Sequence, residues 1–190
     1  MKKAIILHGM PDEEDYYRAD GDSESNCHWL PWIQKQLILN DILAQTPELP
    51  KPFEPNYDDW CNTFNQYELE SETILIGHSC GGGFLLKWLS ENDIKVGKVV
   101  LVAPWIDPEK ETAPEFFDFH IDPNTLSKVS KLTIMYSLDD YPDVVESVNL
   151  IREVLPNADY LEFEDKQHFT YKDMGTREFP ELLEALEFNL

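Results

Sequence analysis

The stretch with the clearest chemical potential is "GHSCG", residues 77 to 81, in which a serine stands between two glycines. An apolar run, "TILI", precedes it, and "GGFLLKWLSEN", which fits a helix with one apolar stripe, follows from residue 82. Gly-x-Ser-x-Gly between a buried strand and a helix is typical of a nucleophile elbow, a strained turn that exposes the serine hydroxyl. Side chains at Gly77 and Gly81 would collide with this turn or its neighbours. The pattern predicts Ser79 as a nucleophile, with helix N–H groups directed at an oxyanion.

Two other uses of a glycine-rich turn do not fit this stretch. A phosphate-binding loop needs a Gly-Lys-Ser/Thr ending, and here Phe84 and Leu85 follow the glycines. The dinucleotide-binding pattern Gly-x-Gly-x-x-Gly is not met either. Cys80 is a second possible nucleophile, but its sulfur would have to face the base. We expect its backbone N–H to join the oxyanion hole while its side chain turns elsewhere.

A serine nucleophile needs a base, and the chain has five histidines. The side chain of His78 should diverge from that of its neighbour Ser79, which favours a packing role. His8 ends the first predicted strand, His28 lies where a helix should begin, and His120 lies in an acidic aromatic loop. His168 follows the last predicted strand and precedes the terminal helix, where the chain order serine, acid, histidine places a base. We therefore predict His168 as the base.

The acid that orients the base should follow a strand located between the serine and the histidine. "LTIMYSLDD" offers Asp139 and Asp140, and Asp107 after "LVAPWI" is a rival. Paired aspartates are also common as turn and helix-cap residues. The spacing alone leaves the choice among these carboxylates open.

The second oxyanion donor is expected from the loop after the first strand, where "HGM" places the N–H of Met10. Each such donor contributes about 3 kcal/mol of transition-state stabilisation. We expect the substrate pocket to include His8 from this loop and the aromatic residues Trp105, Phe116 and Phe117 from a later one. Alternatively, the aromatic residues belong to the core.

The elements that must position these residues alternate along the chain. Near-continuous apolar runs predict buried strands at 3–8, 73–77, 98–103, 132–137 and 158–163, with a weaker one at 41–46. Helical patterns with one apolar stripe separate or follow them at 28–40, 57–69, 82–92, 141–155 and 179–188. Such alternation predicts one α/β domain over residues 1–190, with a mostly parallel sheet of about six strands and helices on both faces. Two long loops remain, an acidic one at 10–27 and an aromatic one at 104–123, and loops of this length are usually functional or mobile.

The composition narrows the classes of partner. Fifteen Lys and Arg stand against 37 Asp and Glu, a formal net charge of −22, so nucleic acid and anionic membranes are unfavourable partners. We expect no stretch long enough to span a bilayer and no leader, because the first apolar run reaches "HG" after five residues. Three cysteines without paired spacing suit reduced thiols, and a cytoplasmic location is expected.

The chain resembles the small α/β-hydrolases of the retinoblastoma-binding protein 9 type, which include bacterial YdeN-like proteins. The resemblance runs nearly end to end through "WLPWIQKQL", "TILIGHSCGG", "KVVLVAPW", "YSLDD" and "KQHF". It implies an α/β-hydrolase fold, and we expect no separate lid domain because a chain of 190 residues is too short for one. The family's catalytic triad corresponds to Ser79, Asp140 and His168, so the resemblance selects Asp140 over Asp139.

The leading hypothesis is an intracellular serine hydrolase that cleaves a small-molecule ester, thioester or amide through an acyl-enzyme, with no metal or organic cofactor. The alternative is a protein-binding module on the same fold with weak or vestigial activity, which exposed aromatic side chains in 104–123 would favour. A third hypothesis is a cation site at Asp20, Asp22 and Glu24. That stretch lacks the glycine and terminal glutamate of a calcium loop, and a solvated acidic loop explains it.

Overall fold

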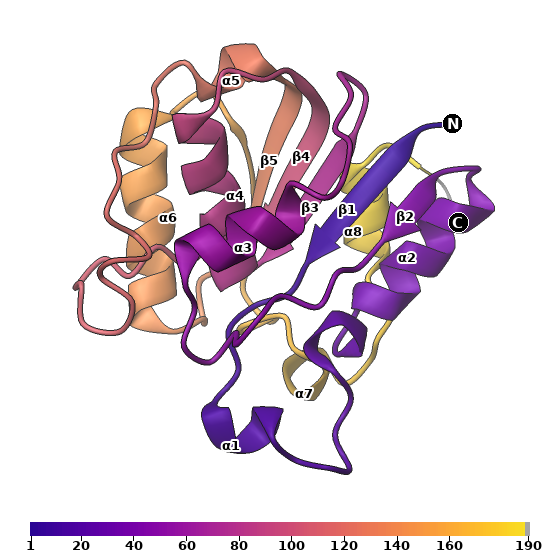
Figure 1. The fold of residues 1–190 in the computed structure, drawn as a ribbon, viewed down its shortest axis with the longest axis vertical. Coiled ribbons are helices and arrows are strands. Elements are labelled where there is room, and N and C mark those ends of the chain that lie inside the picture. The colour runs from indigo at the N-terminus through magenta and orange to yellow at the C-terminus, as the bar shows by residue number, and fades with distance from the viewer. Residues whose placement is uncertain (189–190) are drawn as a thin grey trace.

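The computed structural model describes residues 1–188, and its six strands form one parallel sheet (Figure 1). The order across the sheet is β2-β1-β3-β4-β5-β6. The strands are β1 (Lys3–Leu7), β2 (Leu43–Gln45), β3 (Ile74–His78), β4 (Val96–Val102), β5 (Val129–Ser137) and β6 (Asp159–Phe163). The predicted fold class is confirmed, and all six predicted strands form.

Helices cover both faces of the sheet. In Figure 1, α2 (Leu30–Leu39) and α8 (Pro180–Ala185) lie on one side, and α3 (Tyr57–Phe64), α4 (Cys80–Glu91) and α6 (Pro142–Val154) lie on the other. The shorter helices are α1 (Glu13–Tyr16), the 3₁₀ turn η1 (Glu24–Asn26), α5 (Thr125–Lys128) and α7 (Tyr171–Met174). These short helices were not predicted, because three or four residues are too few to show a 3.6-residue period.

Several helices and strands begin or end at other residues than predicted. The helix predicted at 57–69 ends at Phe64, and the one predicted at 179–188 ends at Ala185. Strands β4 and β5 begin at Val96 and Val129, before the predicted starts, because main-chain pairing continues where side chains become polar. The ends of helices and strands depend on pairing with neighbouring elements, which the pattern of apolar residues does not indicate.

Helix α4 packs closely against the sheet. Every residue from Cys80 to Leu89 is buried, including three consecutive glycines that let the helix approach neighbouring backbone. At Gly83, for example, an added Cβ would lie 2.0 Å from the carbonyl oxygen of Trp105. This close packing positions the first turn of α4 against the ends of the central strands.

The strand order changes direction between β1 and β3. From β1 the chain moves outward to β2, and it then returns to the other side of β1 to form β3. In open parallel sheets, ligands bind outside the carboxyl ends of the strands at such a switch point. The segments that follow β1, β3, β5 and β6 all meet at this edge, and α1 and α7 lie beyond it (Figure 1).

Within residues 1–188, the helices are too short or too polar for any of them to cross a membrane.

Candidate active site

Ser79 lies at the turn from β3 into α4 in a strained backbone conformation. Its φ of 52° and ψ of −120° place a non-glycine residue at positive φ, which costs roughly 1–3 kcal/mol. An added Cβ at Gly77 would lie 2.6 Å from the Gly81 carbonyl oxygen, and one at Gly81 would lie 2.3 Å from the His8 carbonyl oxygen. Both glycines are therefore sterically required, and the turn has the geometry of a nucleophile elbow.

His168 contacts the Ser79 hydroxyl directly. It lies in the segment between β6 and α7, and its Nε2 is 2.9 Å from Ser79 Oγ although the two residues are 89 positions apart. The side chain of His168 is 16% exposed, so one side of the ring faces the cavity described below. A hydroxyl held against an imidazole nitrogen in this way can transfer its proton as it attacks.

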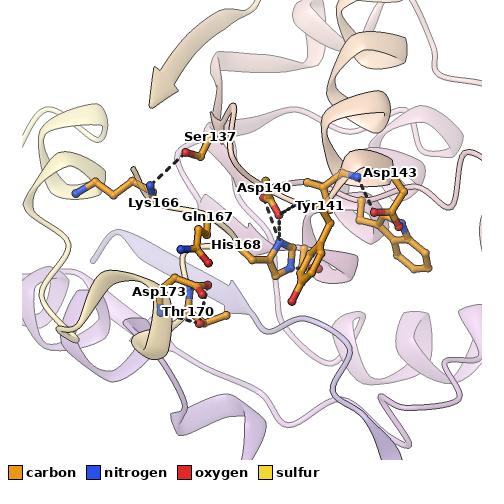
Figure 2. Close-up of polar contacts among 12 residues, drawn as sticks. Ser137, Asp140, Tyr141, Asp143, Lys166, Gln167, His168, Thr170 and Asp173 are labelled. Carbon is orange, nitrogen blue, oxygen red and sulfur yellow. Dashed lines mark hydrogen bonds and ion pairs between the residues drawn. The ribbon is translucent and has the colours of Figure 1, made fainter. Parts of the chain in front are cut away.

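Asp140 supports the other side of the His168 ring (Figure 2). Its Oδ1 and Oδ2 lie 2.8 and 3.1 Å from His168 Nδ1, and its side chain is fully buried. A carboxylate only accepts hydrogen bonds, so Nδ1 carries the proton and Nε2 is free to accept from Ser79. Burial raises the pKa of Asp140, and the hydrogen bond with His168 opposes this effect.

The two other candidate acids bind groups other than the His168 imidazole. Asp139 Oδ1 accepts from the Ser137 hydroxyl at 2.5 Å and from the Gln167 N–H at 3.0 Å. Asp107 is buried and accepts from three N–H groups of its own loop, at residues 111, 112 and 113. Neither carboxylate contacts the imidazole of His168, because each is turned toward a loop that it stabilises.

The two predicted oxyanion donors border the elbow. Cys80 is the first residue of α4, and the loop after β1 passes so close that an added Cβ at Gly9 would lie 3.0 Å from Ser79 Cβ. Met10 follows Gly9 and lines the cavity beside Ser79. The Cys80 side chain is fully buried, and burial raises the pKa of its thiol. A buried neutral thiol of this kind is a poor nucleophile.

A cavity of about 730 Å³ opens over Ser79 and His168. Of the predicted pocket residues, Trp105 lines it, whereas His8, Phe116 and Phe117 do not and lie in the core. His8 Nε2 accepts from the Leu49 N–H at 2.9 Å, and its burial lowers its pKa. The prediction for these three residues is corrected, because the tertiary structure provides each of them with a buried partner.

The aromatic loop packs inward. The rings of Phe116 and Phe117 lie 4.8 Å apart, and they contact Trp60 and Trp105 at 5.0 and 5.4 Å. Because both rings are buried, they form no exposed surface for a protein partner. Phe116 and Phe117 therefore do not support the alternative of a protein-binding module.

Sequence reasoning missed much of the cavity wall. Both the acidic 10–27 loop and the segment after His168 contribute to it, and the Arg177 guanidinium joins them through an ion pair with Asp22 and a 3.3 Å bond to the Asn26 carbonyl. The missed lining side chains include Asp12, Asp15, Arg18, Glu24, His28, Tyr141, Asp143, Lys172 and Asp173. The unusual length and charge of the 10–27 loop were the only signals for this arrangement.

His78 borders the cavity next to Ser79, although almost none of its surface is exposed. It is buried, and burial, followed by its neighbours His168 and His28, lowers its pKa well below the ordinary value. Its neutral Nε2–H donates to the His168 carbonyl oxygen at 2.8 Å, since a carbonyl can only accept. Its ring also packs edge-on against Trp29 at 5.6 Å, so a packing role is part of what it does.

In residues 1–188, no three side chains of His, Cys, Asp or Glu converge in a way that could hold a metal ion. Asp22, one of the three carboxylates considered for a cation, is instead paired with Arg177.

Comparison with known proteins agrees with this architecture. The chain is 28% identical over 146 residues to the putative hydrolase YdeN of Bacillus subtilis, covering 73% of this chain and 71% of that protein. The crystal structure of the ydeN gene product from B. subtilis superposes with a TM-score of 0.82 at 24% identity, covering 98% of this chain and 97% of that one. FphF, a fluorophosphonate-binding serine hydrolase of Staphylococcus aureus, shares the fold with a TM-score of 0.58 at 17% identity, over 93% and 81% of the two chains.

These likenesses confirm the resemblance to YdeN-like proteins. The sequence model of the serine hydrolase family matches residues 20–187, which include the elbow, the aspartate pair and the histidine segment. This chain belongs to the serine hydrolase family.

Proposed function

We propose that this protein hydrolyses a small-molecule ester, thioester or amide through an acyl-enzyme on Ser79, with His168 and Asp140 completing a catalytic triad. The observation that carries the proposal is the continuous chain of contacts from Ser79 Oγ to His168 Nε2 at 2.9 Å and from His168 Nδ1 to Asp140 at 2.8 Å. This chain lies beneath a cavity on a strained elbow. Strain of this kind is typical of functional sites.

In the first half of the reaction, Ser79 Oγ attacks the substrate carbonyl carbon while its proton passes to His168 Nε2. The carbonyl oxygen becomes an oxyanion, and the N–H groups of Met10 and Cys80 stabilise it by about 3 kcal/mol each. When the intermediate collapses, the bond to the leaving group breaks and His168 returns the proton to that group. The acyl group remains on Ser79.

In the second half, a water molecule takes the place of Ser79 as the attacking group. His168 removes its proton, the second tetrahedral intermediate forms on the same donors, and the proton returns to Ser79 Oγ as the acid departs. The buried carboxylate of Asp140 balances the positive charge that His168 carries twice in each cycle. The chain's own residues therefore supply every proton transfer.

Labelling with a fluorophosphonate probe, followed by mass-spectrometric mapping, tests this proposal. We expect modification of Ser79 in the folded protein and its loss in Ser79→Ala and His168→Ala, because phosphonylation needs the same activated hydroxyl. Ser79→Ala should also lower kcat by four or more orders of magnitude with any ester that the protein cleaves. Absence of labelling in the folded wild-type protein would contradict the proposal and favour a binding module on this fold.

A further inference from the structure

The segment that presents His168 has an unfavourable backbone. Gln167 and Phe169, its two neighbours, have φ values of 44° and 57°, in the left-handed region that residues with side chains seldom adopt. One turn bond, from the Phe169 N–H to the Lys166 carbonyl at 2.8 Å, closes the segment on itself. Such a conformation persists only where the surrounding structure over-determines it. The contacts that hold the segment from outside therefore decide where the imidazole lies.

The first outside contact comes from the loop after β5. Asp139 Oδ1 accepts from the Gln167 N–H at 3.0 Å, and the Ser137 hydroxyl donates to the same oxygen at 2.5 Å. Ser137 Oγ in turn accepts from the Lys166 N–H at 3.2 Å (Figure 2). Because Ser137 is fully buried at the end of β5, this small network connects the histidine segment to the sheet.

The second outside contact comes from the elbow. The Nε2–H of His78 donates to the His168 carbonyl oxygen at 2.8 Å. His78 is the last residue of β3 and directly precedes Ser79. The residue beside the nucleophile therefore binds the backbone of the base, and this contact connects the end of β3 to the segment after β6.

We propose that Asp139 and His78 are positioning residues, which hold the backbone on both sides of His168 so that its Nε2 meets Ser79 Oγ. This inference rests on the proposed function of His168 as the base. In the histidine segment both side chains make their hydrogen bonds to main-chain groups, and the His78 ring also packs against the His168 ring with the centroids 5.1 Å apart. A displacement of about 1 Å at a catalytic group costs roughly 100-fold in rate, which explains why two contacts from separate strands are used.

Matched variants separate positioning from packing. His78→Phe keeps an aromatic ring between Trp29 and His168 but removes the donor, whereas His78→Gln keeps an N–H near the position of Nε2. Asp139→Ala removes the acceptor, whereas Asp139→Asn keeps an oxygen that can accept from the Gln167 N–H. Asp139 is exposed, so its variants should fold even if those at buried His78 do not.

The readouts are kcat and KM for a p-nitrophenyl ester, Tm, and the His168 Nε2 to Ser79 Oγ distance in crystal structures of the variants. We expect His78→Phe and Asp139→Ala to lower kcat about 10- to 100-fold with KM within twofold, and to move Nε2 beyond hydrogen-bond range. Glutamine and asparagine should restore kcat to within about threefold. Equal kcat values within each pair, or an unmoved imidazole in the Phe and Ala variants, would overturn the proposal.

The crystallographic distance keeps this test separate from that of the proposed function. If the wild-type protein neither labels nor turns over, the catalytic proposal fails while the displacement of His168 is still measured. If the wild-type protein is active and the paired variants do not differ, the positioning proposal alone fails.

Discussion

Replacing Asp140 by asparagine tests the contribution of the buried carboxylate to catalysis apart from that of the other groups in the site. The substitution keeps the shape of the side chain and removes its charge. An amide can also present an N–H to His168, which would favour the tautomer with the proton on Nε2, and this tautomer cannot accept the proton of Ser79. We expect binding of the substrate to persist and proton transfer to fail.

The magnitude follows from the geometry. When His168 becomes positively charged, its Nδ1 lies 2.8 Å from Asp140 Oδ1. At an effective dielectric constant of about 20, two unit charges at that separation attract by about 6 kcal/mol. Because each 1.36 kcal/mol corresponds to a factor of ten, kcat should fall by about four orders of magnitude. This matches the loss that generally follows from the same exchange in a serine, histidine and aspartate triad.

Stability should change in the opposite direction. Burial raises the pKa of Asp140 above its value in the unfolded chain, so the ionised side chain lowers stability at neutral pH. That cost is full above the folded-state pKa, declines as the pH falls below it, and disappears below the lower pKa of the unfolded chain. A neutral amide avoids the cost, so we expect Asp140→Asn to have a Tm at pH 7 at least equal to that of the wild-type protein.

The assay compares steady-state hydrolysis of a p-nitrophenyl ester by Asp140→Asn and Asp139→Asn, with thermal unfolding of both. Asp139 is a matched control because it is the adjacent aspartate and contacts backbone instead of the imidazole. The reasoning is refuted if Asp140→Asn keeps more than about a tenth of the wild-type kcat, or if Asp139→Asn is the variant that loses four orders of magnitude.

Three further predictions concern the elbow and its surroundings. Gly81→Ala places a Cβ 2.3 Å from the His8 carbonyl oxygen, so overpacking should cost about 3 kcal/mol and exceed the gain of about 1 kcal/mol in helix propensity. Urea unfolding should therefore show a net loss of stability of about 2 kcal/mol. An unchanged unfolding midpoint would contradict this prediction. Cys80→Ala should keep kcat within about threefold of the wild-type value and lose about 1 kcal/mol of stability, because the thiol is buried. A variant that folds but is inactive would instead indicate that the sulfur takes part in the chemistry. Burial lowers the pKa of His28 to about 4, so its contribution to stability should be full above about pH 6.5 and decline as the pH falls toward 4. The difference in unfolding free energy between wild type and His28→Asn at pH 7.5 and pH 5 measures this, and a difference that does not change with pH would contradict it.

The local pattern of the chain was sufficient for the architecture and for the position of the strained turn at Ser79. Continuous apolar runs alternating with amphipathic stretches lead to a parallel sheet with helices on both faces, because strands buried on two sides leave no polar face. Gly77 and Gly81 mark the elbow in the sequence, and the collision avoided at Gly77 is with the turn itself, whereas the one avoided at Gly81 is with the carbonyl oxygen of His8 at the end of β1. The order of serine, aspartates and histidine along the chain was equally readable.

Only the tertiary structure decided which side chains meet. Asp139 and Asp140 are adjacent, yet one turns toward the Gln167 N–H and the other toward the His168 imidazole, 28 residues away. The pocket was decided in the same way, since Phe116 and Phe117 found partners in the core while the acidic 10–27 loop formed part of the cavity wall. Residue types and the local spacing of apolar residues predict helices, strands and turns. Contacts between distant segments depend on the path of the whole backbone, and no local pattern carries that information.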